Sequence, residues 1–165
     1  MKGLKGKVAF VTGSSRGIGR AAALELARAG GSVIFHGTAP SAALDSAAAE
    51  AGTDSLKLTA DFSDLQAVEL LAEKLIKEQN VPEILVLNAS VQSYTGLGNF
   101  DAAEYLRMFN TNVESSCILL HRLLPEMRKK MWGRVIFVPL RNWHRTSASL
   151  SQHFTRVSWR VSTLL

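Results

Sequence analysis

Three glycines in the segment VTGSSRGIGR, residues 11–20, have the type and spacing that could bind a diphosphate. Such glycines let the backbone turn sharply and approach phosphate groups, and the N-terminus of a following helix offers unpaired N–H groups. The segment is not a Walker loop, because no Lys-Ser or Lys-Thr pair follows the last glycine. The alternative is a glycine-rich turn without a ligand. The pattern predicts a dinucleotide site formed by Gly13, Ser14, Ser15, Arg16, Gly17, Ile18 and Gly19.

Two further polar residues come directly after segments that have the pattern of buried strands. Asp61 follows SLKLTA, and Asn88, with Ala89 after it, follows EILVL. Ligands of open α/β sheets bind at the carboxyl ends of the strands. Asp61 could therefore accept a hydrogen bond from an adenine amino group, or it could cap the helix that begins near SDLQ. Asn88 could contact a ribose or hold neighbouring backbone together.

Strand and helix patterns alternate along the chain, and this order positions those residues. Four of the five predicted strands are nearly continuous apolar runs, as expected for a parallel sheet with helices on both faces. The pattern predicts an α/β fold with a doubly wound, Rossmann-type parallel sheet and three α/β/α layers. The predicted strands lie at 7–13, 32–37, 55–61, 83–90 and 134–138, with Ser41 a candidate cap for the second helix and Ser63 or Asp64 for the third.

A long helical segment separates the fourth and fifth predicted strands. It runs from residue 101 to 131 and contains two helices that meet near residues 110–112. Asparagine has a poor helix propensity, so Asn112 inside this segment indicates a tertiary hydrogen bond. The alternative is an asparagine that faces the solvent.

Four motifs in this order resemble the short-chain dehydrogenase/reductase family over residues 5–138. The glycine turn resembles its TGxxxGxG signature, AD at 60–61 its adenine-contacting Asp, LNAS at 87–90 its NNAG motif, and NTNV at 110–113 the segment with its active-site Asn. The glycine turn and early strands are similar to those of 3-oxoacyl-[acyl-carrier-protein] reductases. The resemblance implies an oxidoreductase that moves a hydride between NAD(P) and a carbonyl or alcohol, in which Asp61, Asn88 and Ala89 bind the cofactor and Asn112 is catalytic.

The residues at the end of the second predicted strand help to distinguish NAD(H) from NADP(H) as the cofactor. An acidic residue there would bind the ribose hydroxyls of NAD, but the sequence has His36, Gly37 and Thr38. Arg16 carries a guanidinium, which suits a 2′-phosphate, although it could also be a solvated loop residue. We therefore expect NADP(H) rather than NAD(H), with His36 in the cofactor site.

The acid/base residues that the resemblance implies are absent from the sequence. The family uses a Tyr and a Lys four residues later, after a Ser that follows the fifth strand, and these positions fall near Leu140, His153 and Val157. The only tyrosines, Tyr94 and Tyr105, precede that strand. His153 could replace the Tyr as the acid/base group, but the sequence around it indicates no orienting partner, and an incidental surface histidine is the alternative. We expect no turnover and a carbonyl substrate only if the chain is active; the alternative is a non-catalytic dinucleotide-binding or interaction protein.

The last 27 residues differ in composition from the rest. Residues 139–165 contain four arginines and no Gly, Asp, Glu or Lys, and they carry most of the net charge of +5. We expect a dinucleotide-binding domain at 1–138, truncated after the fifth strand, and a divergent basic tail at 139–165. Two explanations for this change of composition are open: a shift of reading frame near codon 139, and a natural short variant. Binding of nucleic acid by this tail is a weak alternative, and an uncovered fifth strand favours self-association.

The remaining composition indicates the compartment. No apolar run is long enough for a membrane span, and no signal peptide is recognisable. The single Cys117 excludes an internal disulfide and suits a reducing compartment. We predict a cytoplasmic protein without a membrane partner and without a metal site.

Overall fold

The computed structural model describes residues 3–52, 55–92 and 99–138. His153 and the other expectations about residues 139–165 lie outside these residues.

The described strands form one parallel sheet with the order β3-β2-β1-β4-β5. Its centre is β1, where Phe10 lies beside Ile34 of β2 on one side and beside Leu85 of β4 on the other. The order of the strands thus reverses at the boundary between β1 and β4, and open α/β sheets bind ligands at such a boundary. The strands are β1 (Val8–Val11), β2 (Ser32–Gly37), β3 (Ser55–Thr59), β4 (Ile84–Leu87) and β5 (Arg134–Phe137).

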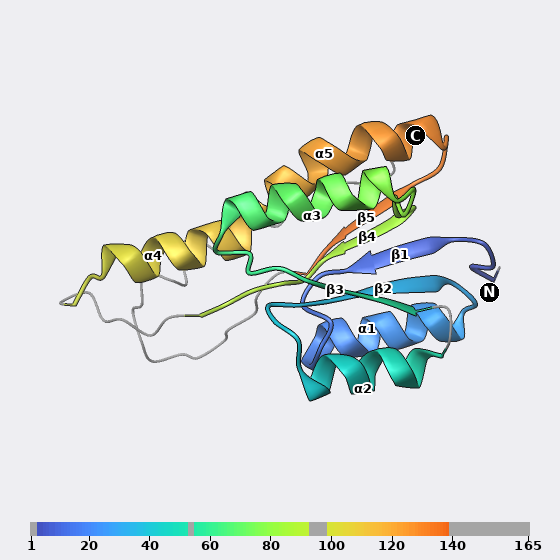
Figure 1. Cartoon of the computed structure of the whole chain (residues 1–165), viewed down its shortest axis with the longest axis horizontal. Coiled ribbons are helices and arrows are strands. Elements are labelled where there is room, and N and C mark those ends of the chain that lie inside the picture. Colours follow the sequence, from blue (N-terminus) through green and yellow to red (C-terminus); the bar gives the residue numbers. More distant parts are fainter. Residues whose placement is uncertain (1–2, 53–54, 93–98, 139–165) are drawn as a thin grey trace.

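Helices cover both faces of the sheet, which confirms the predicted three-layer, doubly wound architecture. The helices α1 and α2 lie on one face, α3 and α5 lie on the other, and α4 extends beyond the sheet (Figure 1). The predicted junction near residues 110–112 is a π-helical turn, η1, between α4 and α5. The helices are α1 (Gly17–Arg28), α2 (Ala42–Ala51), α3 (Leu65–Lys77), α4 (Ala102–Phe109), η1 (Asn110–Glu114) and α5 (Ser115–Lys129).

Two hydrophobic clusters hold the layers together. Successive side chains of a strand point to opposite faces of a sheet, and in β1 this sends Phe10 into one cluster and Val11 into the other. The cluster of Phe10 also contains Val68 of α3 and Leu119 of α5, and both are fully buried. Strands β1 and β4 are buried on both faces, so their carboxyl ends are rigid supports for the residues that follow them.

Strand β5 differs from the central strands because it is the edge of the described sheet. Its residues alternate between exposed and half-buried, and Ile136 remains 46% exposed.

Candidate functional site

The glycine turn lies between β1 and α1, and two of its glycines pack too closely for any side chain. A Cβ atom on Gly13 would lie 2.9 Å from the Cα of Ala89, and one on Gly19 would lie 2.4 Å from both the side-chain nitrogen of Asn88 and the carbonyl oxygen of Gly13. Gly17 has a φ of +59° and open space beside it. Gly13 and Gly19 thus bring the start of α1 against the end of β4, while Gly17 leaves room for a ligand.

The start of α1 has no side-chain cap, unlike the starts of α2, α3 and α4. Ser41, Asp64 and Asp101 each accept hydrogen bonds from backbone N–H groups at the starts of those helices. Arg16 at the corresponding position of α1 makes no such bond, and the first turn contains no acidic residue. The first N–H groups of a helix have no partner within it and carry partial positive charge. The glycine turn therefore presents donors that suit a phosphate.

The structure decides the cap of α3 between the two candidates in favour of Asp64. Its Oδ1 accepts from the N–H groups of Gln66 and Ala67. Ser63 instead donates to Asp61. The predicted cap of α2, Ser41, is confirmed.

A network centred on Thr12 and Asn88 joins the ends of β1 and β4. The Thr12 hydroxyl donates to the carbonyl of Val86 at 3.3 Å and accepts from the N–H groups of Asn88 and Ala89 at 2.8 and 2.9 Å. The Asn88 side-chain nitrogen donates to the carbonyls of Thr12 and Gly13 at 3.0 and 3.2 Å. The structure shows that Asn88 holds neighbouring backbone together; the contact of Asn88 and Ala89 with the cofactor stays a prediction.

Sequence reasoning did not single out Thr12, although it is 1% exposed and makes three of these bonds. The available signal was a hydroxyl residue at the boundary between an apolar strand and a glycine turn. A buried hydroxyl there needs partners, and only the neighbouring strand can supply them.

His36 lies beneath the glycine turn and is 2% exposed. Its Nδ1 accepts from the N–H of Gly13 at 3.1 Å, and its Nε2 is 3.1 Å from the carbonyl oxygen of Ala60. A carbonyl oxygen only accepts, so Nε2 carries the proton and the ring is neutral. Burial lowers the pKa of His36 to about 4, although the bond to Ala60 acts in the opposite direction. The expected contact of His36 with a cofactor stays a prediction, and the structure directs the ring toward the protein interior.

The predicted turn residues differ in exposure. Ser14 is fully buried, and its hydroxyl accepts from the backbone N–H of His36 at 2.8 Å. Arg16 and Gly17 are exposed, Ser15 is half-buried, and Ile18 is 68% exposed. The exposed part of the turn is therefore the part that a ligand can contact.

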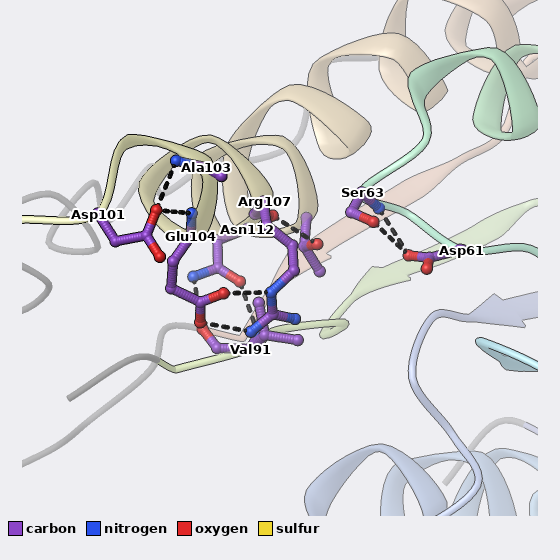
Figure 2. Close-up of polar contacts among 9 residues, drawn as sticks. Asp61, Ser63, Val91, Asp101, Ala103, Glu104, Arg107 and Asn112 are labelled. Atoms are coloured by element: carbon purple, nitrogen blue, oxygen red, sulfur yellow. Dashed lines mark hydrogen bonds and ion pairs between the residues drawn. The ribbon is translucent and has the colours of Figure 1, made fainter. Parts of the chain in front are cut away.

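Asp61 lies after β3, on the loop that leads to α3 (Figure 2). Its Oδ1 accepts from the backbone N–H and the hydroxyl of Ser63 at 2.9 and 2.8 Å. These two bonds are the main reason that the pKa of Asp61 is lowered, and the positive charge of Arg107 adds a smaller effect. Asn110 donates to the carbonyl of Ser63 at 3.0 Å and so ties this loop to η1. Asp61 is ionised and exposed; its contact with adenine stays a prediction.

Asn112 makes the tertiary hydrogen bonds that its place in a helix indicated. Its Oδ1 accepts from the N–H of Val91 at 2.8 Å, and its side-chain nitrogen donates to the carbonyl of Val91 at 2.9 Å (Figure 2). The residue lies in η1, and π-helical turns frequently occur at functional sites. Asn112 thus fixes the segment that follows β4, and its catalytic role stays a prediction.

The structure brings most of the predicted residues to the carboxyl edge of the sheet. The glycine turn, His36, Asn88 and Ala89 form one contiguous cluster, and Ala60 connects it to Asp61. Among the described residues, no group of His, Cys, Asp and Glu side chains could hold a metal ion. Nor does any helix in the described part of the chain have the length and apolar character needed to cross a membrane.

The neutral, buried state of His36 predicts a pH-dependent stability. The folded pKa of about 4 lies below the ordinary value of 6.5, so the unfolded chain binds more protons between these two values. Stability should therefore fall as the pH decreases from 6.5 toward 4, by roughly 3 kcal/mol for a shift of this size. Urea unfolding at pH 7 and pH 5 measures the part of this loss, about 2 kcal/mol, that falls between those two pH values.

The matched variants for this measurement are His36→Gln and His121→Gln, since His121 is exposed on α5. The first should show a smaller loss of stability on acidification than the wild type, and the second should not. An equal loss in the wild type and in His36→Gln would contradict the prediction.

Comparison with known proteins agrees with this geometry. The family model for short chain dehydrogenases matches residues 7–146. The 3-oxoacyl-[acyl-carrier-protein] reductase of Pseudomonas aeruginosa is 39% identical over 137 residues, which cover 81% of this chain and 55% of that protein. The NADPH-dependent pterin aldehyde reductase of Arabidopsis thaliana is 31% identical over 163 residues, which cover 96% of this chain and 66% of that protein.

Solved structures show the same fold. A 3-oxoacyl-(acyl-carrier-protein) reductase from Agrobacterium tumefaciens with NADP bound has a TM-score of 0.82 and 34% identity, over 93% of this chain and 60% of that one. A metagenomic short-chain oxidoreductase in complex with NADP also has a TM-score of 0.82, with 26% identity over 92% of this chain and 70% of that one. The chain thus spans between half and two-thirds of the length of the two curated relatives. It belongs to the short chain dehydrogenase family, in which it resembles the 3-oxoacyl-[acyl-carrier-protein] reductases.

Proposed function

We propose that this chain binds NADP(H) at the glycine turn between β1 and α1. The observation that carries the proposal is the packing of Gly13 and Gly19, which leaves no room for a Cβ atom and places the uncapped start of α1 at the edge of the sheet. The residues present fit the cofactor: the turn and the first N–H groups of α1 would hold the diphosphate, and Asp61 would hold the adenine. When bound, NADPH supplies a hydride.

The preference for NADP(H) over NAD(H) rests on two features of the turn. Arg16 is exposed immediately before α1, where its guanidinium can reach a 2′-phosphate. No carboxylate faces the ribose from the end of β2, because His36 is buried and is followed by Gly37 and Thr38. Two structures similar to this chain contain NADP, and a similar plant reductase is described as NADPH-dependent.

We further propose that the 165-residue chain does not transfer the hydride by itself. The resemblance implies a Tyr and a Lys four residues later as the proton-transfer pair, and the sequence contains no such pair. Asn112 remains at the one matching position, where its amide binds Val91. The chain would then act as a dinucleotide-binding module. It would bind a carbonyl substrate only if the chain is an active enzyme.

Residues 1–138 form the binding unit in this proposal and residues 139–165 the divergent tail, although the family model continues past this boundary to residue 146. We place the protein in the cytoplasm, where the exposed thiol of Cys117 would stay reduced. Binding of nucleic acid is not part of the proposal.

We also propose that the chain self-associates, because β5 is an edge strand of the described sheet. An edge strand presents unpaired N–H and C=O groups to other chains. Ile136 of this strand is 46% exposed, so apolar area adds to the edge that the described residues leave unpaired.

The proposed selection of NADP(H) predicts a difference between the two reduced cofactors. Titration followed by NADPH fluorescence should show tighter binding of NADPH than of NADH. Arg16→Ala should weaken NADPH binding by roughly tenfold or more, because hydrogen bonds to a charged group contribute about 1.5–3 kcal/mol. NADH binding should change little, since NADH lacks the 2′-phosphate.

The control for this titration is Arg28→Ala. Arg28 lies in the last turn of α1, exposed and paired with Glu25, so its removal should leave both affinities unchanged. Equal affinities for NADPH and NADH in the wild type would contradict the proposed selection, and an absence of binding would contradict the proposed site.

Another prediction concerns activity. Purified chain incubated with NADPH and a panel of ketones should give no oxidation of NADPH above the rate without protein, because the proton-transfer pair is absent. Steady turnover by homogeneous material would overturn this proposal and leave the proposed binding site intact. Loss of that turnover in His153→Phe would then assign the proton transfer to His153.

A further prediction concerns the edge strand. Ile136→Lys should shift the chain toward the monomer in light scattering at high concentration, because an edge lysine opposes pairing between strands. Leu70→Lys, at a residue of α3 that is 56% exposed, is the control and should have little effect. A wild-type chain that is monomeric at high concentration would exclude association through β5.

A further inference from the structure

One buried residue, His36, joins the two parts of the proposed site. Its backbone N–H donates to the Ser14 hydroxyl at 2.8 Å, and its carbonyl accepts from the N–H of Ser14 at 2.8 Å. Its ring accepts from Gly13 on one side and donates to Ala60 on the other. Ala60 directly precedes Asp61. A single residue of β2 therefore contacts both the glycine turn, which we propose binds the diphosphate (the diphosphate turn), and the loop of Ala60 and Asp61, which we propose binds the adenine (the adenine loop).

Packing fixes the ring in this position. The imidazole stacks on Phe62 with ring centroids 4.1 Å apart and an interplanar angle of 25°. Phe10 approaches edge-on, with centroids 6.1 Å apart. Both ring nitrogens have partners and the residue is 2% exposed, so the ring has no donor or acceptor left for a ligand.

We propose that His36 is a positioning residue for the dinucleotide: it fixes the distance between the glycine turn and the loop of Asp61 from beneath. This role replaces the direct contact with the cofactor that the sequence led us to expect for His36. This inference rests on the proposed function of the glycine turn. The adenine and diphosphate of one dinucleotide are covalently joined, so both ends bind together only when the protein holds their sites at a matching distance. A site that is organised before binding loses less free energy when the ligand is ordered.

The test compares a whole ligand with one of its ends. NADP⁺ spans both parts of the site, whereas adenosine 2′-monophosphate lacks the diphosphate. Both affinities are measured by calorimetry on the full chain. The affinity for NADP⁺ divided by that for adenosine 2′-monophosphate reports whether the two parts of the site lie at the distance that the dinucleotide requires. General damage to the fold would lower both affinities and leave the ratio unchanged.

Three variants are compared with the wild type. His36→Leu removes both ring hydrogen bonds and should reduce the affinity ratio by roughly tenfold, the equivalent of one or two lost hydrogen bonds. His36→Gln offers an amide oxygen and an amide N–H in place of the two ring nitrogens and should recover most of the ratio. His121→Gln, at an exposed residue of α5, should match the wild type.

The outcomes separate this inference from the proposed function. A wild type that binds NADP⁺, together with a His36→Leu variant that keeps the wild-type ratio, would overturn the positioning role alone. A wild type that does not bind NADP⁺ would overturn the proposed function and the positioning role with it.

If His36→Leu does not fold, the tautomer of the wild-type ring tests the same role. Nitrogen-15 NMR of the wild-type imidazole should show Nε2 protonated and Nδ1 unprotonated. A proton on Nδ1 would overturn the inference, because that nitrogen could then accept nothing from Gly13.

Discussion

The close approach of the glycine turn to the end of β4 is the constraint on which the rest of this site depends. Gly19 leaves no room for a Cβ atom because the side chain of Asn88 and the carbonyl of Gly13 would each lie 2.4 Å away. This approach lets Asn88 reach the carbonyls of the turn, and it lets Thr12 bridge β1 and β4. The start of α1 consequently lies at the boundary between β1 and β4, where the order of the strands reverses. This is the usual ligand position in this class of fold.

The buried polar groups around this point position the backbone. Thr12, Ser14 and His36 are almost fully buried, and each makes hydrogen bonds to a neighbouring strand or loop. Buried polar groups are stable only when they have partners, so these residues define one arrangement of the turn. The groups that remain for a ligand are the exposed Arg16 and the first N–H groups of α1.

The residues proposed to bind the dinucleotide and the positions implied for proton transfer belong to different segments of the chain. The residues that would hold the dinucleotide extend from Gly13 to Ala89, and hydrogen bonds connect Gly13 to His36 and to Asn88 at the carboxyl edge of the sheet. The proton-transfer residues that the family resemblance implies would follow β5, where the sequence has neither Tyr nor Lys. Under the proposed function, this chain would bind the dinucleotide without supplying that acid/base chemistry.

The sequence by itself determined the alternation of strands and helices, the doubly wound sheet and the place of the glycine turn, because each depends on local periodicity or on glycine spacing. It also indicated that Asn112 makes a tertiary hydrogen bond. Only the tertiary structure decided that the His36 ring points inward, that Asn88 binds the turn and that Thr12 connects two strands. The partners of Thr12 and Asn88 lie more than 70 residues away along the chain. Hydrogen-bond partners at that separation depend on which strands are neighbours, and periodicity within each strand carries no information about that order.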